Sequence, residues 1–440
     1  MGVRSPVVLP NGCSLWRAFC DMIAARQLAA RQILAPGVFI PLPSERATGT
    51  LDYRQRFPAL DGIRALAVTL VFAAHYGGGG TNGGPILKVL DSIRKRGGVG
   101  VDIFFVLSGF LITGILYDTV QDRKYFQRFF ARRSLRILPI VYLLFFLIAI
   151  LTPIFHYQWK WKHAFFLVYL GNFFGNADFS LYEFRSLNHP TADIQIGHLW
   201  SLCVEEQFYI CWPIIVYFVR DRIKLLWTSA ILCVLTLLCR VAMVHLATPE
   251  MAELWIVRTL PFRFDALLFG AILALLLRGS LAQVIQRSMK WVLLLGLIPL
   301  LLIYKFSPEY ASAWNLTIGL TLVGVAAAGL IGMTLDPDSI AFKVFHWRPA
   351  RILGKYSYGF YVWHVIWAKA WIEVLVFFTK RSHSTAIGGL ITLPLAFCVT
   401  FLMAKLSYDL FEVRFLKYKR HFEYDSEIVA HKHAFAADGR

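Results

Sequence analysis

Two ionisable residues in the apolar segment that follows residue 57 could do chemistry. Arg64 and His75 are eleven positions apart, so on an α-helix they share a face and stand roughly 16 Å apart along the axis. Charged side chains inside a membrane helix are costly and mark functional sites. A histidine takes up or releases a proton near neutral pH, which suits a general base acting on a hydroxyl group. An interfacial histidine that only hydrogen-bonds a neighbour is the structural alternative for His75.

Three acidic residues in apolar segments are candidates to assist such a base. Glu205 and Glu206 are adjacent, so on a helix their side chains point about 100° apart and at most one of them can face a given site. Periodicity does not choose between them, and both can instead be structural counter-ions. Asp102 lies near the outer end of its segment, where it can partner a cation or His75.

Arginines gather in the segment 123–136. Arg128, Arg132 and Arg136 recur every four residues and form one stripe on a helix, with Arg133 beside it. Guanidinium groups pair with phosphate oxygens through parallel hydrogen bonds, so the stripe is a candidate phosphate-binding site. Anchoring at the cytoplasmic face of a membrane also explains one or two such arginines.

The segment 98–114 is rich in small residues, among them Ser108 and Gly109. Such residues allow another helix or a ligand chain to approach the backbone closely. Tight helix packing and a path for a ligand are therefore both open for this segment.

Ionisable and aromatic residues come together twice more along the chain. Arg263 and Asp265 stand in the motif R-F-D, and Tyr361 and His364 stand in the motif Y-V-W-H. We expect these four residues to contact the substrate. Aromatic side chains around a histidine are a reasonable lining for a sugar-binding surface. They are equally typical of the aromatic belt at a membrane interface.

The composition indicates that these residues are carried by membrane helices. Hydrophobic residues make up 57% of the 440 residues and charged residues only 16%, whereas soluble domains carry about 25% charge. The net charge of +18 is then a topology signal rather than a sign of nucleic-acid binding. The seven cysteines show no C-x-x-C spacing, so neither a metal site nor a disulfide framework is expected. We predict an all-α integral membrane protein.

Apolar windows long enough to cross about 30 Å of hydrocarbon predict about ten transmembrane helices. The apolar patch at 163–174 is too short to span and is expected to be re-entrant or interfacial. The windows lie near residues 61–77, 99–118, 135–154, 198–219, 225–246, 261–278, 288–304, 313–334, 354–376 and 385–409.

The loops richest in lysine and arginine fall on one side of such a bundle, which predicts that both termini are cytoplasmic. Arg94, Lys95 and Arg96 are the exception. Residues 1–56 are expected to form a basic extension, either an amphipathic helix on anionic lipid or a disordered leader. Residues 57–415 form the predicted transmembrane domain, and residues 416–440 a cytoplasmic tail.

Taken together, seven motifs resemble the acyltransferase type 3 family of bacterial multi-pass O-acyltransferases. Any one of these motifs is weak, but all seven in order are highly specific, and they cover roughly residues 57 to 415. The motifs are F-P-A-L-D-G-I-R-A at 57–65, G-V-D-I-F-F-V-L-S-G-F-L-I-T at 100–113, R-R-S-L-R-I-L-P at 132–139, G-H-L-W-S-L-C-V-E-E-Q-F-Y at 197–209, R-F-D-A-L, Y-S-Y-G-F-Y-V-W-H and L-S-Y-D-L-F-E.

The resemblance implies an acyltransferase bundle of ten helices in the bacterial inner membrane. It also implies that cytoplasmic acyl-CoA, by default acetyl-CoA, donates its acyl group to a hydroxyl of an extracytoplasmic or lipid-linked saccharide. Arg64 and His75 match the family's arginine and histidine, and Arg132, Arg133 and Arg136 match its cytoplasmic arginine motif, read as contacts to the CoA phosphates. The motif positions that remain are filled by Glu205 or Glu206, Ser108, Gly109 and His364.

We therefore expect the donor's pantetheine arm to thread past Gly109 toward His75. His75 would deprotonate the acceptor hydroxyl with help from Glu205, Glu206 or Asp102. A multi-pass transporter of a lipid-linked sugar or an acidic solute is the alternative function, because buried arginine, glutamate and histidine also form proton-coupled pathways.

Overall fold

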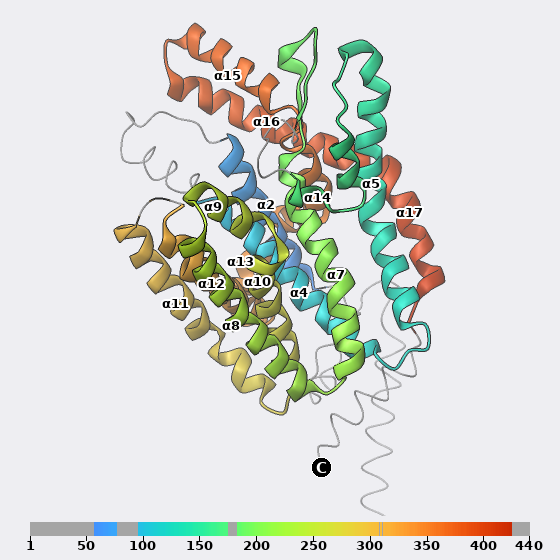
Figure 1. Cartoon of the computed structure of the whole chain (residues 1–440), viewed down its shortest axis with the longest axis vertical. Helices are drawn as coiled ribbons and strands as arrows, with labels where there is room; N and C mark the ends of the chain where they lie inside the picture. The colour runs from blue at the N-terminus through green and yellow to red at the C-terminus, as the bar shows by residue number, and fades with distance from the viewer. Residues whose placement is uncertain (1–56, 77–95, 175–182, 308, 310, 425–440) are drawn as a thin grey trace, which may run out of the picture. The chain divides into compact units, whose positions relative to one another are not determined.

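The computed structural model describes residues 57–424, apart from 77–95, 175–182, 308 and 310 (Figure 1). Within these ranges, nine helices are long and apolar enough to cross a membrane, and a tenth span results if two helices joined by a sharp bend count as one. The predicted all-α, multi-pass membrane fold is confirmed. The predictions for residues 1–56, for Arg94 and Lys95, and for the end of the tail from residue 425 lie outside the described residues.

Five of the ten predicted windows agree with spans to within three residues at each end, whereas α5 begins ten residues before its window. The bounds are α2 Pro58–Tyr76, α4 Val99–Thr119, α5 Tyr125–Phe155, α7 Trp200–Val219, α8 Arg222–Leu246, α9 Pro249–Arg258, α10 Leu260–Leu276, α11 Ala282–Phe306, α12 Leu320–Thr334, α14 Arg348–Trp363, α15 Ala368–Ser382 and α16 Thr385–Ser407. The last span continues beyond the predicted window through η8 Tyr408–Glu412, α17 Val413–Lys417 and η9 Tyr418–Phe422.

Short elements fill the connections between the spans. The apolar patch at 163–174 does not form a spanning helix, because it contains only single turns. These elements are η2 Trp161–His163, α6 Ala164–Leu167, η3 Gly171–Phe173, η6 Gly197–Leu199, α13 Ile340–Phe345 and an antiparallel pair of strands, β1 Glu183–Phe184 and β2 Ile194–Gln195.

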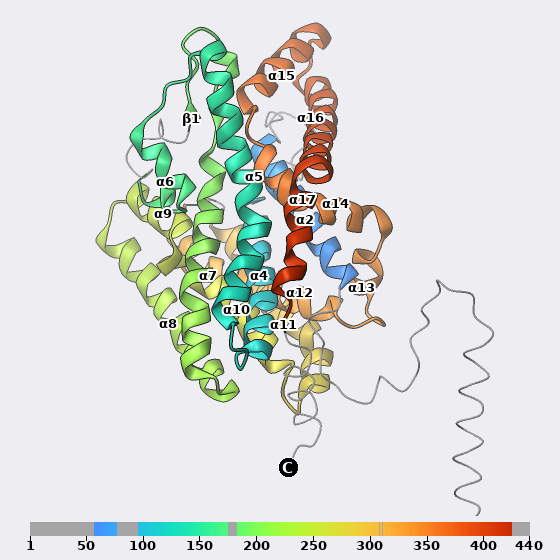
Figure 2. The ribbon, with the colours of Figure 1, turned by 90° about the vertical axis from the view of Figure 1, so that its right-hand side faces the viewer.

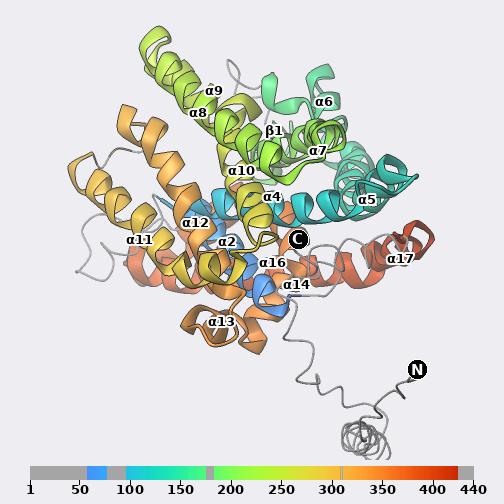
Figure 3. The same ribbon diagram turned by 90° about the horizontal axis from the view of Figure 1, so that it is seen from below.

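Helix α4 lies in the middle of the bundle, with α2, α10 and α12 packed around it (Figure 3). Glycines bring α4 and α10 into close contact. A Cβ atom on Gly109 would lie 1.8 Å from the backbone oxygen of Leu267, and one on Gly270 would lie 1.9 Å from that of Val106. Gly109 is therefore a helix-packing residue, and its expected place along the path of the donor is wrong.

The predicted single helix at 354–376 is also wrong, because the chain bends by 95° between α14 and α15. The bend begins at His364. The backbone oxygen of Ile366 accepts a hydrogen bond from the N–H of Gln195 in β2, at 3.2 Å. Lys369 at the start of α15 pairs with Asp193 and Glu183, so the segment that contains the strands holds α15 in its bent direction.

The two ends of the bundle differ in charge. At one end, called the basic end, Arg278 in the turn after α10 pairs with Asp118 of α4, and Arg222 lies against the same turn. At the other end, called the histidine end, the Tyr76 hydroxyl donates a hydrogen bond to the backbone oxygen of His364. Figure 2 shows α15 and the start of α16 at the histidine end, opposite the α7–α8 turn.

Candidate functional site

A cavity of about 230 Å³ lies inside the bundle, between α2, α4, α5, α7 and α14. We call it the central cavity. Arg64, Arg133 and Arg136 line its part nearer the basic end, and Tyr361 lines its part nearer the histidine end. Most of the wall between them is apolar, with Phe104 as an example. The cavity thus connects a cluster of cations with the region of the predicted base.

One member of the predicted arginine stripe, Arg136, and the neighbouring Arg133 reach this cavity. Arg133 and Arg136 line the cavity, whereas Arg132 donates hydrogen bonds to the backbone oxygens of Lys419 and Phe422, both at 3.3 Å. Arg132 therefore binds the end of the last span and does not line the cavity. The side chain of Arg136 makes no hydrogen bond or ion pair within the described part of the chain, so its charge is open to a ligand.

A hydrogen-bonded group projects from α4 and α7 into the central cavity. The Tyr209 hydroxyl donates to Oε2 of Glu205 at 3.2 Å and accepts a hydrogen bond from Ser108. The guanidinium of Arg133 lies 5.6 Å from the centre of the Tyr209 ring. Glu205 lines the cavity, but Glu206 does not, and Oε1 of Glu206 is buried without a hydrogen-bond partner. Of the two glutamates, only Glu205 could meet a ligand in this cavity.

Three histidines meet at the histidine end of the bundle. His75 is exposed at the end of α2, and its Nδ1 atom lies 2.9 Å from the backbone oxygen of Val71 and 3.4 Å from Nε2 of His364. His364 and His198 are both buried, and their ring centres are 5.0 Å apart. The cluster combines residues from α2, η6 and the bend after α14. His75 alone of the three faces solvent.

Hydrogen bonds to backbone oxygens assign the tautomers of these rings. A carbonyl oxygen can only accept, so Nδ1 of His75 carries a hydrogen, and its Nε2 is left with a lone pair. Nδ1 of His364 faces the backbone oxygen of Tyr361 at 2.6 Å and carries a hydrogen for the same reason. Nε2 of His364 is then an acceptor for the Nδ1–H of His75. This arrangement leaves Nε2 of His75 able to take a proton.

Tyr361 stands between the central cavity and the histidine cluster. Its hydroxyl donates to the backbone oxygen of His198 at 2.6 Å and accepts from Oγ of Ser201 at 2.5 Å. Its ring centre lies 5.3 Å from that of His364. The predicted site residues Tyr361 and His364 are thus brought beside His75, although His364 lies behind it rather than facing solvent.

The carboxylates that were expected to assist His75 lie elsewhere. Glu205 follows His198 by seven residues, which places it about 10 Å nearer the basic end. Asp102 pairs with Arg263 of α10. The hydrogen bonds of His75 within the described residues go to Val71 and His364.

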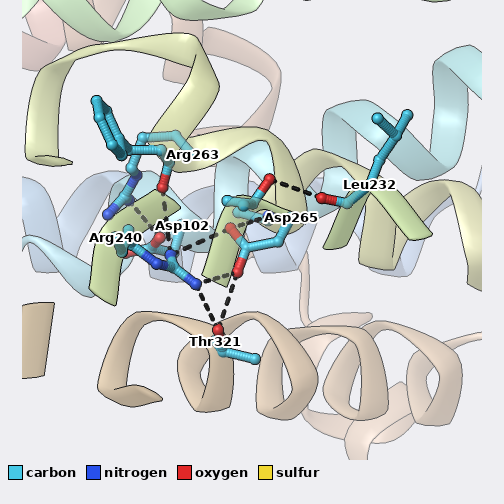
Figure 4. A network of polar contacts seen from close by, with 9 residues as sticks. Asp102, Leu232, Arg240, Arg263, Asp265 and Thr321 are labelled. Carbon is cyan, nitrogen blue, oxygen red and sulfur yellow. Dashed lines mark hydrogen bonds and ion pairs between the residues drawn. The ribbon is translucent and has the colours of Figure 1, made fainter. Parts of the chain in front are cut away.

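A buried charge network explains the positions of the other predicted residues (Figure 4). Asp102 pairs with Arg263, while Asp265 accepts two hydrogen bonds from Arg240, at 2.5 and 3.2 Å, and one from Thr321 at 3.0 Å. The four charged residues are at most 3% exposed. The network joins α4, α8, α10 and α12, and neither Arg263 nor Asp265 lines the central cavity. Their predicted contact with a substrate is therefore replaced by a structural role.

The sequence analysis missed two residues, His198 of the histidine cluster and Arg240 of the charge network. His198 was recognised only as part of the motif that opens α7, and Arg240 was not recognised at all. A single arginine in the otherwise apolar segment 225–246 was the available signal for Arg240. For His198 the signal was a histidine at the start of a span.

Comparisons with known proteins agree with the motifs. The family profile described as an acyltransferase domain matches residues 57–405. The chain is 31% identical to the peptidoglycan O-acetyltransferase OatA of Listeria monocytogenes, over 72% of this chain and 50% of that protein. It is 27% identical to the O-acetyltransferase OatA of Staphylococcus aureus, over 82% of this chain and 57% of that protein. It is also 31% identical to YrhL of Bacillus subtilis, over 82% of this chain and 55% of that protein. The chain spans about half the length of the curated relatives it matches, and no solved structure matches it.

Proposed function

Because this chain belongs to the acyltransferase type 3 family, we propose that it is a membrane-bound O-acyltransferase that moves an acyl group from acyl-CoA to a hydroxyl of a cell-envelope saccharide. Acetyl is the simplest acyl group, since the relatives are named as O-acetyltransferases, and two of these names support peptidoglycan as the acceptor. The observation that carries the proposal is the central cavity, which runs from three arginines to a tyrosine beside three histidines.

The charge asymmetry supports a donor that enters from the cytoplasm of a bacterium. Lysine and arginine are enriched in cytoplasmic loops of membrane proteins, and the basic end carries the α4–α5, α7–α8 and α10–α11 turns. In this orientation both ends of the described chain lie on the cytoplasmic side. Arg133 and Arg136 would then bind donor phosphates near the cytoplasm, and His75 would meet the acceptor at the outer face.

The proposed reaction uses the free Nε2 atom of His75. As the acceptor oxygen attacks the thioester carbonyl, Nε2 takes the hydroxyl proton, and the Nδ1–H stays bonded to Val71 and His364. The tetrahedral intermediate then collapses, the C–S bond breaks, and the imidazolium returns the proton to the departing CoA thiolate. The products are the acylated saccharide and free CoA.

The test uses inverted membrane vesicles, whose outer surface is the cytoplasmic face, supplied with acetyl-labelled acetyl-CoA. We expect label to enter saccharide in the wild type, and we expect His75→Ala to lower the rate about 10²–10⁴-fold, the usual contribution of a general base. His245→Ala is the matched control, because His245 is exposed on α8 and lines neither the central cavity nor the histidine cluster.

Two outcomes would contradict the proposal. Full transfer by His75→Ala would remove His75 from the role of base. If the wild type released no CoA thiol from any acyl-CoA in the presence of saccharide, the acyltransferase function would fail, and transport of a lipid-linked sugar would be measured next.

A further inference from the structure

A second cavity, of about 330 Å³, adjoins the central cavity at the basic end of the bundle. We call it the basic cavity. Arg64 and Arg136 line both cavities, so the two share these guanidinium groups. The walls that belong to the basic cavity alone come from α2, α14, η8, α17 and η9, and they include Lys355, Tyr408 and Lys419. A ligand that fills the central cavity as far as the arginines would continue into this space.

The charges around the basic cavity do not balance. Four cations line it, Arg64, Arg136, Lys355 and Lys419, against the carboxylates of Asp61 and Glu412. Asp61 is paired with Arg64, and Glu412 accepts a hydrogen bond from Ser407 at 3.2 Å.

The cations that remain lack acidic partners. Within the described residues, the side chains of Arg136, Lys355 and Lys419 form no ion pair, and Lys355 instead lies 4.9 Å from the centre of the Tyr408 ring. Arg136 and Lys355 are exposed and Lys419 is half-buried, so these cations can pair with an anion that enters the cavity from solvent. Because several of these cations line one cavity, an anion that carries more than one charge could pair with two or more of them at once.

The orientation that the proposed donor would take along the two cavities indicates which anion this is. If the acyl group lies by Tyr361, the extended pantetheine arm occupies the apolar central cavity, and the pyrophosphate reaches Arg64 and Arg136. The ribose, its 3′-phosphate and the adenine then enter the basic cavity. Tyr358 and Tyr408 line this cavity, and a planar base can stack on aromatic side chains of this kind.

Resting on the proposed function, we propose that the basic cavity binds the phosphorylated nucleoside end of acyl-CoA, and that Lys355 and Lys419 contact its 3′-phosphate. The lysines thereby select donors that carry this phosphate. A phosphate headgroup of a membrane lipid has the same chemistry and is the competing occupant.

The first experiment compares acetyl-CoA with 3′-dephospho-acetyl-CoA in the full-length protein. We expect the wild type to show a KM on the order of tenfold lower for acetyl-CoA, because a charge-assisted hydrogen bond is lost with the phosphate. In Lys419→Ala and in Lys355→Ala this preference should shrink toward one, with kcat little changed. Lys417→Ala is the matched control, since Lys417 is exposed in α17 and lines neither cavity.

A binding measurement separates this inference from the proposed function. Adenosine 3′,5′-bisphosphate is titrated into the protein in nanodiscs of phosphatidylcholine, with and without phosphatidylglycerol, and no turnover is needed. Binding that Lys419→Ala weakens about tenfold supports the basic cavity, even if acetyl transfer fails.

Three results would overturn the inference while leaving the acyltransferase intact. The first is acetyl transfer with an unchanged preference for acetyl-CoA in both lysine variants. The second is equal weakening of binding by Lys417→Ala. The third is loss of bisphosphate binding in the discs that contain phosphatidylglycerol, which would assign the cavity to a lipid headgroup.

Discussion

His364 lies directly behind the proposed base, which makes it the sharpest test of the histidine arrangement. Its Nε2 atom lies 3.4 Å from Nδ1 of His75, and its own Nδ1–H faces the backbone oxygen of Tyr361, so Nε2 can only accept a hydrogen bond. Replacing His364 by Asn removes the acceptor at this position. Replacing it by Gln places an amide oxygen close to the position of Nε2. The pair of variants differs in this one acceptor.

The size of the effect follows from the charge on His75 during the reaction. Before proton transfer the Nδ1–H belongs to a neutral ring, and afterwards it belongs to a cation. A hydrogen bond contributes about 0.5–1.5 kcal/mol between neutral groups and about 1.5–3 kcal/mol to a charged group. The gain on reaching the transition state is thus about 1–1.5 kcal/mol, or roughly tenfold in rate. We expect His364→Asn to lower kcat about tenfold with KM unchanged, and His364→Gln to recover most of that loss.

The assay is the initial rate of saccharide acetylation over a range of acetyl-CoA concentrations, in vesicles that contain equal amounts of each variant. His75→Ala provides the scale, because it removes the base itself. The reasoning would be refuted if His364→Asn and His364→Gln had equal kcat values. It would also be refuted if His364→Asn lost as much activity as His75→Ala while its level in the membrane stayed normal.

Two predictions concern the packing that positions the site, and both are measured by thermal unfolding of the detergent-solubilised protein. Gly109→Ala would place a Cβ 1.8 Å from the oxygen of Leu267, and overpacking of this kind costs about 1–3 kcal/mol. Gly389→Ala is its control, because no atom lies within 4 Å of the added Cβ; equal midpoints would contradict the close α4–α10 contact. Arg240→Met leaves Asp265 buried without its partner and should cost about 3–5 kcal/mol. Arg240→Met with Asp265→Leu should recover most of that stability, and a double variant as unstable as the single one would contradict the pairing.

Hydropathy predicts most of the spans because a long apolar segment in lipid has to satisfy its backbone hydrogen bonds internally. At 354–376, hydropathy predicts an apolar segment but not the bend within it. Its apolarity covers both α14 and α15, but the bend depends on a partner far away in the chain, the N–H of Gln195, which bonds to Ile366. Composition within a window carries no information about such a partner.

The arginine stripe shows a similar limit of helical periodicity. Arg132 and Arg136 are four residues apart and share a face, as predicted. Their long side chains nevertheless reach different partners, because Arg132 finds the backbone oxygens of Lys419 and Phe422 while Arg136 opens into the cavities. Spacing along one helix predicts which residues are neighbours, and the packing of the last span decides which of them is left unpaired.

The partner of Asp102 depends on how the helices pack, and it bears on whether a carboxylate lies beside His75. Its position in the sequence allowed either a cation or His75 as its partner, and the close approach of α10 to α4 at Gly109 brings Arg263 to it. A carboxylate beside His75 would stabilise the protonated ring. Within the described residues, the hydrogen-bond partners of His75 are instead a backbone oxygen and the neutral ring of His364. With Asp102 paired to Arg263, Nε2 of His75 keeps the lone pair that the proposed reaction would use.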